Sequence, residues 1–314
     1  MDISIKRRTR FRILPFITFI FFFLIAFLLY QSLSEINFSE VKAALSKVSL
    51  KGLLPTLGLV IFNFIILATY DFMGFRYLKI PGISTFKIFW SAMICYTFTL
   101  NLGAFVGGLG LRYRIYSGWD VSIGDITKVI IFSTLSNWLG HIFLLSFVIL
   151  QGRQEVVILT GLPMEATYFI STLGIVIVIL YFLLCSKRKQ ITYKKEEFIF
   201  PPIKLAFVQL LLSVIQWSLL TAIIMSLMEQ LGAAPNFIQV LFTYLLSGLA
   251  GVVTHIPAGL GVHEAVFLKM NFKITSFNIL AVLIIFRVIY YLIPLLLALP
   301  AYLGIEYYQK RIKT

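Results

Sequence analysis

Residues 278–304 read NILAVLIIFRVIYYLIPLLLALPAYLG, an apolar stretch long enough to cross a membrane, with Arg287 near its middle. A bilayer core of about 30 Å needs roughly 20 apolar residues in helical form. A guanidinium at that depth costs about 2.5–3.5 kcal/mol on insertion scales, so it usually faces a polar partner or a water-filled cavity. The stretch therefore predicts a spanning helix whose arginine either makes a structural ion pair or holds an anionic group inside the membrane.

The composition of the whole chain also indicates a membrane protein. Hydrophobic residues make up 60% of the 314 residues, and charged residues only 13%. A water-soluble domain of this size has no place to bury so much apolar surface, so we predict an all-α integral membrane protein. The formal net charge of +14 does not indicate nucleic-acid binding, because Lys and Arg cluster between the apolar stretches.

Six stretches, including residues 278–304, are long and apolar enough to cross the membrane fully. The other five are residues 13–33, 52–70, 129–150, 166–185 and 205–228. The first of these follows a basic segment, as a signal peptide would. Its apolar core is longer than that of a signal peptide and no small-residue cleavage site follows, so we expect a retained anchor.

Two further apolar regions, near residues 88–118 and 240–270, are interrupted by glycines. If both crossed fully, Lys and Arg would be spread evenly over the two sides of the membrane. If each enters and returns on the same side, most of the 27 Lys and Arg residues lie in the cytoplasm, as the positive-inside rule favours. We therefore predict two re-entrant hairpins inserted from opposite faces, with both termini cytoplasmic. The alternative is that the glycines only let ordinary helices pack closely.

The two hairpins have similar tips. The tip residues are Gly107, Gly108 and Gly110 in the first hairpin, and Pro257, Gly259 and Gly261 in the second. Oppositely inserted equivalents are typical of an inverted-topology repeat, here a single membrane domain with halves at residues 12–150 and 166–305. Non-helical backbone at membrane depth needs protein or water partners, so the hairpins also predict a polar cavity.

Two carboxylates are expected at membrane depth, and each needs a partner there. Asp71 lies late in the second span and Glu264 lies just past the second tip. An ionised carboxylate without a partner is too costly in the membrane, so either one is expected to pair with Arg287 or Arg112.

Three uncharged polar residues have predicted structural roles. Asn101 at the first tip and His255 at the second are placed to hydrogen-bond exposed backbone, and helix ends at such tips favour ionic headgroups. His141 lies on an otherwise apolar span, where we expect a hydrogen-bonded structural histidine.

Several kinds of chemistry are not indicated by the sequence. No G-x-x-x-x-G-K motif for nucleotide binding and no H-E-x-x-H pair occurs, and Cys95 and Cys185 lie in apolar segments without ligand spacing. We therefore predict no metal site, no cofactor and no catalytic residue.

Several short motifs occur along the chain in a specific order. They are SEINF (34–38), Tyr70-Asp71, Leu100-Asn101 with the glycines leading to Arg112, LSGL (246–249), IPAGLG (256–261) and FRVIYYLIP (286–294). In this order they resemble the transmembrane flippase region of the bacterial multiple peptide resistance factor, or lysylphosphatidylglycerol synthase, family. The resemblance covers nearly the whole chain.

The resemblance implies a stand-alone lipid translocator of the bacterial cytoplasmic membrane. It would move lysyl-phosphatidylglycerol or a related anionic or aminoacylated phospholipid between leaflets, a process connected with antimicrobial peptide resistance. Asp71 and Arg287 match charged positions of the family's path, whereas Gln216 stands where the family often has an acidic residue. The full expected headgroup path consists of Arg287, Asp71, Arg112, Glu264, Asn101, His255, Gln216 and Tyr291.

Long members of the family also carry a cytosolic lysyltransferase domain. The sequence ends at Thr314, so we expect no transferase activity from it. The expected partners are membrane phospholipids and not nucleic acid, with a homo-oligomer or a separate lipid-modifying enzyme left open. The alternative functions are a secondary transporter of a small solute, a membrane-embedded transferase and a scaffold for another enzyme.

Overall fold

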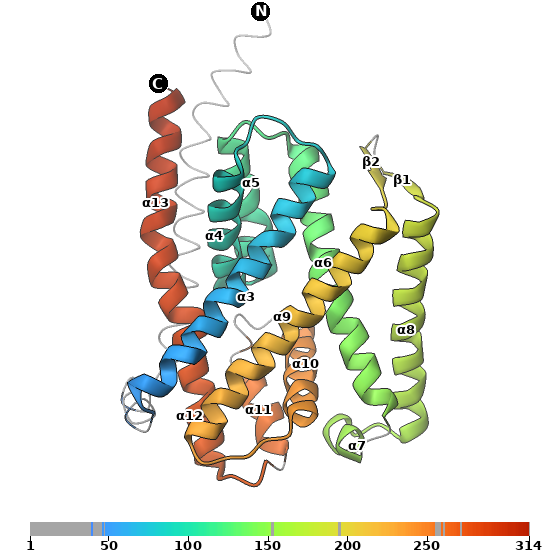
Figure 1. Cartoon of the computed structure of the whole chain (residues 1–314), viewed down its shortest axis with the longest axis vertical. Coiled ribbons are helices and arrows are strands. Elements are labelled where there is room, and N and C mark those ends of the chain that lie inside the picture. The colour runs from blue at the N-terminus through green and yellow to red at the C-terminus, as the bar shows by residue number, and fades with distance from the viewer. Residues whose placement is uncertain are drawn as a thin grey trace, which may run out of the picture.

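The computed structural model describes residues 39, 46, 48–151, 154–193, 196–254, 259, 261–270 and 272–313. The predicted first span, residues 13–33, lies outside them, as do His255 and Pro257 of the predicted second tip. The described residues form a bundle of helices that run between two ends (Figure 1).

Two small elements mark the ends of the bundle. The antiparallel strands β1 (Gln190–Tyr193) and β2 (Glu196–Ile199) lie at one end, and helix α7 (Gln154–Thr160) lies at the other (Figure 1). We call these the β1–β2 end and the α7 end. The two-stranded sheet is a small addition to the predicted all-helical fold.

Five helical segments run from one end of the bundle to the other. They are α3 (Leu50–Tyr77), α6 (Ile123–Leu150), α8 (Met164–Ser186), α9 (Ile203–Gln230) and the continuous run of α12 (Ser276–Arg287), η3 (Val288–Leu292) and α13 (Ile293–Lys313). Serine side chains cap two of them, with Ser49 Oγ accepting from the Gly52 amide and Ser122 Oγ from the Asp125 amide, both over 3.1 Å. Seven stretches of the described chain are long and apolar enough to span a membrane, which confirms an all-α integral membrane protein.

The first glycine-rich region forms a hairpin. It consists of α4 (Thr85–Gly103), the π-helical segment η1 (Ala104–Gly110) and α5 (Leu111–Gly118). Past the end of the hairpin, Trp119 Nε1 donates to Ser91 Oγ over 3.3 Å, and Lys87 Nζ lies 4.1 Å from the centroid of the Trp119 ring. Because these contacts join its two feet, the hairpin enters and leaves at the β1–β2 end.

The backbone of this hairpin reverses earlier than the sequence predicted. Gly103 has φ +79°, a conformation that glycine adopts without the usual steric cost, and η1 begins directly after it. Gly107 and Gly108 therefore lie beyond the turn, where η1 packs against α4. The sequence did not distinguish the roles because a turn and a close helix contact both require glycine.

Gly107→Ala is expected to destabilise the protein by about 1–3 kcal/mol, the typical cost of overpacking a well-packed site. A Cβ atom there would overlap the carbonyl oxygen of Phe98 on α4, so the hairpin would have to shift. Gly58→Ala is the matched control, since nothing lies within 4 Å of its Cβ position. Thermal unfolding of the purified variants measures the difference, and equal stability of the two would contradict the close contact.

The second glycine-rich region forms a hairpin from the opposite end. It consists of α10 (Phe237–Thr254) and α11 (Val262–Lys269), with positive φ angles of 59° at Gly259 and 76° at Gly261 between them. Ser247 Oγ lies 2.7 Å from His263 Nδ1, so the two arms are joined near the tip. Both feet lie at the α7 end, and the two hairpins occupy opposite halves of the bundle (Figure 1).

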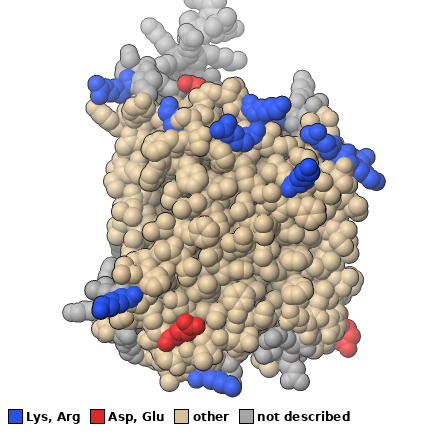
Figure 2. All heavy atoms as spheres, in the orientation of Figure 1, with Lys and Arg blue, Asp and Glu red and all other residues tan. Residues whose placement is uncertain are grey.

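Charged residues are distributed unequally over the two ends. On the face drawn in Figure 2, Lys and Arg gather at the β1–β2 end, and a broad band without charged side chains separates them from the α7 end. Exposed examples at the β1–β2 end are Lys79, Lys187, Arg188 and Lys189. The uncharged band matches the part of a helical bundle that lies in hydrocarbon.

Candidate functional site

A buried ion pair joins α3 to the first hairpin. Arg112 Nε and Nη2 donate to the two Asp71 carboxylate oxygens over 3.0 and 3.2 Å, and the Tyr116 hydroxyl donates to Asp71 over 2.7 Å. Arg112 Nη1 donates to the Gly108 carbonyl over 3.1 Å, and its guanidinium carbon lies 4.3 Å from the Tyr96 ring centroid. Asp71 is fully buried, so the charges of this pair are satisfied inside the protein.

A second ion pair joins α12 to the second hairpin. Arg287 Nε and Nη2 each donate to a Glu264 carboxylate oxygen over 2.9 Å, and Nη2 also donates to the Gly259 carbonyl over 3.3 Å. The side chains of Arg287 and Glu264 keep 11% and 22% of their surface exposed, against 5% and 0% for Arg112 and Asp71. Arg287 is thus paired with Glu264 and not with Asp71, and this pair is the more accessible one.

The two pairs have corresponding geometry with the charges exchanged. In each, an arginine binds a carboxylate and a glycine carbonyl of the hairpin, Gly108 in one case and Gly259 in the other. The arginine belongs to the hairpin in the first pair and to the spanning helix in the second. Asp71 lies on the span before its hairpin and Arg287 on the span after its hairpin, so the two pairs differ in their place along the chain.

The pairs lie at different depths in the bundle. Arg287 lies eleven residues after the start of α12 at Ser276, about 17 Å along the helix from the α7 end at 1.5 Å per residue. Asp71 precedes the end of α3 at Tyr77 by six residues, about 9 Å from the β1–β2 end on the same scale. Each half of the bundle therefore contains one arginine–carboxylate pair.

A network of buried polar side chains crosses the middle of the bundle. Asn63 Nδ2 donates to the Gln216 carbonyl over 2.8 Å, and the Tyr290 hydroxyl donates to Asn63 Oδ1 over 2.7 Å. Asn137 Nδ2 donates to Gln216 Oε1 over 3.2 Å. The network joins α3, α6, α9 and η3, so the predicted path residue Gln216 serves as a crosslink between helices.

The π-helical turn η3 connects the final span to the first hairpin. Pro294 follows it and has no N–H to donate to the preceding turn, a common cause of such a local widening. Asn101 Nδ2 donates to the carbonyl of Tyr291 in η3 over 3.3 Å and to Thr97 over 2.9 Å. Asn101 thus hydrogen-bonds the backbone of η3, and it ties the first hairpin to the helix that carries Arg287.

His141 corrects one expectation from the sequence. Its ring is 1% exposed and lies between Trp138 and Trp217, with centroid distances of 4.8 and 4.5 Å, but neither ring nitrogen has a hydrogen-bond partner. The prediction of a hydrogen-bonded histidine was therefore wrong. Packing between two aromatic rings holds the side chain, and a single sequence does not show which neighbours a spanning helix will meet.

His141→Leu is expected to raise the stability of the protein by about 1–3 kcal/mol, because it removes a buried polar group that lacks a partner. Gln209→Leu is the matched control with the opposite expected sign. Gln209 is fully buried, accepts from the Tyr181 hydroxyl and donates to Ser136 Oγ, both over 2.7 Å. Thermal unfolding in detergent measures both, and a destabilised His141→Leu would contradict this expectation.

A metal centre is not evident in the part of the chain that the structure describes. No group of three or more His, Cys, Asp or Glu side chains there is placed to hold a metal ion. The candidate site consists of the two ion pairs, the hairpins that carry them and the polar network between them.

Comparison with known protein families gives a match over most of the chain. The sequence profile of the family described as "Lysylphosphatidylglycerol synthase TM region" matches residues 16–298. The chain belongs to this family. The protein is accordingly a multi-pass bacterial membrane protein of a lipid-related family.

Similar proteins include two relatives that the match covers over most of their length, and a longer enzyme that it covers in part. Inner membrane protein YbhN of Escherichia coli K12 is 34% identical over 308 residues, covering 95% of this chain and 94% of the relative. Uncharacterized protein slr0712 of Synechocystis is 27% identical over 271 residues, with coverage of 84% and 83%. The phosphatidylglycerol lysyltransferase of Staphylococcus haemolyticus is 25% identical over 300 residues, which cover 92% of this chain but 34% of the enzyme.

Proposed function

We propose that this protein is a lipid translocator that moves an anionic or aminoacylated phospholipid, such as lysyl-phosphatidylglycerol, between membrane leaflets. The observation that carries the proposal is the partly exposed Arg287–Glu264 pair inside the bundle. Charged groups at membrane depth usually mark a substrate pathway or relay. The chain belongs to a family that is named after the synthase of a lipid, lysylphosphatidylglycerol, and this supports a lipid as the substrate.

The pair offers complementary groups to such a headgroup. A guanidinium binds a phosphate through two parallel hydrogen bonds, and a carboxylate accepts from an ammonium group. When the Arg287–Glu264 pair opens, Arg287 would bind the phosphate and Glu264 would bind the amine of an aminoacylated lipid. With an aminoacylated lipid, neither charge is then left unpaired in the membrane. An unpaired charge there would cost several kcal/mol.

The Asp71–Arg112 pair has a different role in this proposal. Its groups are buried and each has partners within the protein, so it fastens the first hairpin beside the path. The acyl tails would stay in hydrocarbon while the headgroup passes between the hairpins, and rocking of the two halves would change the open side.

The charge distribution supports one orientation of the protein. The excess of Lys and Arg at the β1–β2 end supports a cytoplasmic position of this end under the positive-inside rule. Helix α13 ends at the β1–β2 end, so the C-terminus would be cytoplasmic (Figure 1). The α7 end would face the other leaflet. With no nucleotide-binding motif in the sequence, the simplest modes are downhill exchange and coupling to an ion gradient.

Leaflet-resolved assays on vesicles that contain only this polypeptide test the proposal. Phosphatidylglycerol, lysyl-phosphatidylglycerol and phosphatidylcholine are each followed with a chemical quencher that reaches one leaflet. We expect protein-dependent movement of the first or second lipid above the rate in protein-free vesicles. Uptake of small solutes without any lipid movement would instead support the solute transporter, and no transport of either kind would contradict translocation.

A further inference from the structure

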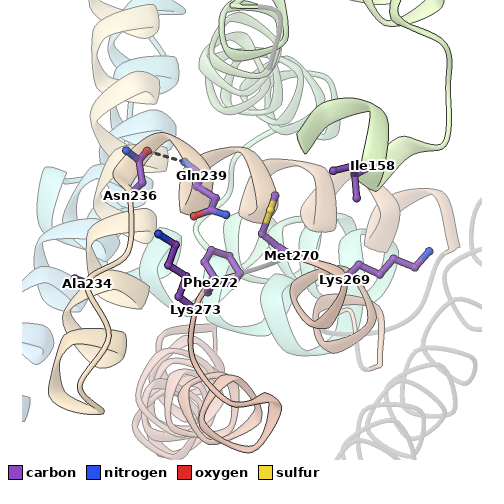
Figure 3. Close-up of a pocket in the computed structure, with 8 residues that line it drawn as sticks. All are labelled: Ile158, Ala234, Asn236, Gln239, Lys269, Met270, Phe272 and Lys273. Carbon is purple, nitrogen blue, oxygen red and sulfur yellow. Dashed lines mark hydrogen bonds between the residues drawn. The ribbon is translucent and has the colours of Figure 1, made fainter. Parts of the chain in front are cut away.

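A pocket of about 380 Å³ lies at the α7 end, away from both ion pairs. Its volume is within the range of small-molecule sites. Four segments line it: α7, the loop before α10, the start of α10, and the end of α11 with the loop that follows (Figure 3). The lining residues are Ile158, Ala234, Asn236, Gln239, Lys269, Met270, Phe272 and Lys273.

The lining is amphipathic and cationic. Met270 and Phe272 are 5% and 4% exposed and form an apolar surface, while Ile158 contributes an exposed apolar side chain. Lys269 and Lys273 supply two ammonium groups, and no carboxylate occurs among the described lining residues. Figure 3 shows the Lys273 amine toward Asn236 and Gln239, whereas Lys269 extends away from them. This combination suits an anion that is attached to an apolar body.

The pocket is connected to the second ion pair through a short helix. Glu264 lies in the first turn of α11, near the tip, and the helix ends at Lys269, about 8 Å further along its axis. Gln239 lies at the other foot of the same hairpin. A molecule in the pocket therefore touches both feet of the hairpin whose tip region binds Arg287.

We propose that this pocket binds the phosphate-bearing headgroup of an anionic phospholipid from the leaflet at the α7 end. Lys273 binds the phosphate beside the amides of Asn236 and Gln239, which bind headgroup hydroxyls. Lys269 adds positive charge at the other side of the pocket, and the apolar lining contacts the glycerol and the start of the acyl chains. The site would load or release lipid at the foot of the hairpin. This role rests on the proposed translocation, but binding itself is measured separately.

The test uses the full chain in lipid nanodiscs with a photoreactive phosphatidylglycerol, and the labelled peptides are identified by mass spectrometry. We expect labelling within residues 269–273, which falls about fivefold for each of Lys269→Gln and Lys273→Gln, since one basic side chain near an anionic surface contributes about that factor. Lys51→Gln is the charge-matched control, because Lys51 is exposed at the same end but outside the pocket. The Lys269→Arg and Lys273→Arg variants should retain labelling.

Three outcomes would overturn this inference. These are labelling that does not reach the pocket, equal loss in the Lys51 control, and full competition by soluble glycerophosphoglycerol, which would indicate a soluble anion as the ligand. Failure here is distinguishable from failure of the proposed function. If Arg287 variants stop lipid movement while the pocket stays unlabelled, only the pocket assignment falls. If the pocket is labelled in a protein that moves no lipid, only translocation falls.

Discussion

Arg287→Gln is expected to slow movement of an anionic phospholipid by roughly 10- to 100-fold, the loss of one set of charge-assisted hydrogen bonds to a phosphate. Arg287 is the positive member of the accessible pair, so the substitution removes the group that would bind the headgroup. Rates are measured as leaflet exchange of phosphatidylglycerol in vesicles of defined lipid-to-protein ratio.

Two further variants separate this effect from a loss of folding. The double variant Arg287→Gln with Glu264→Gln leaves no lone charge in the bundle, so it should fold but remain slow. Arg114→Gln also breaks an arginine–glutamate pair, with Glu306 on α13 near the β1–β2 end, and should keep the parental rate. Parental exchange in Arg287→Gln, or an equal loss in Arg114→Gln, would contradict the assigned role.

Asp71→Asn is expected to destabilise the protein by about 3–5 kcal/mol, because it leaves Arg112 as an uncompensated buried charge. Asp71 is fully buried and binds both Arg112 and Tyr116, so the substitution affects α3 and the first hairpin together. Thermal unfolding and the yield of monodisperse protein measure the loss.

The double variant Asp71→Leu with Arg112→Met is expected to recover most of this stability. Replacing a buried ion pair by apolar residues of similar volume is often neutral or stabilising. If the pair only fastens the hairpin, the double variant should also translocate lipid. Recovered stability with lost translocation would show instead that Asp71 or Arg112 contacts the headgroup.

Much of the fold could be predicted because a bilayer restricts the choices. Length and hydropathy give the spanning helices, and the asymmetry of Lys and Arg favours hairpins over further crossings. The position of the turn in the first hairpin could not be predicted. Gly103 makes the turn and Gly107 allows a close helix contact, and the sequence shows a glycine at both positions. The strands β1 and β2 were also missed, because a short polar loop carries no strong signal for or against a hairpin.

The candidate site was predictable in its charged members but not in their pairing. A carboxylate at membrane depth needs a cation, yet the sequence allowed Asp71 and Glu264 to exchange partners. Tyr116 was missed, although it lies four residues after Arg112 and so shares one helix face with it. The network through Asn63 and Asn137 depends on how helices distant in sequence rotate against each other, which no local pattern specifies.

The central claim is that a lipid headgroup reaches the Arg287–Glu264 pair. A phosphatidylglycerol with a photoreactive group on its headgroup, reconstituted with the full chain, tests this directly when the crosslinked peptides are mapped. We predict adducts within residues 259–269 or 284–292, which disappear in the double variant Arg287→Gln with Glu264→Gln. Adducts confined to the outer surface of the bundle, unchanged in that variant, would contradict the claim.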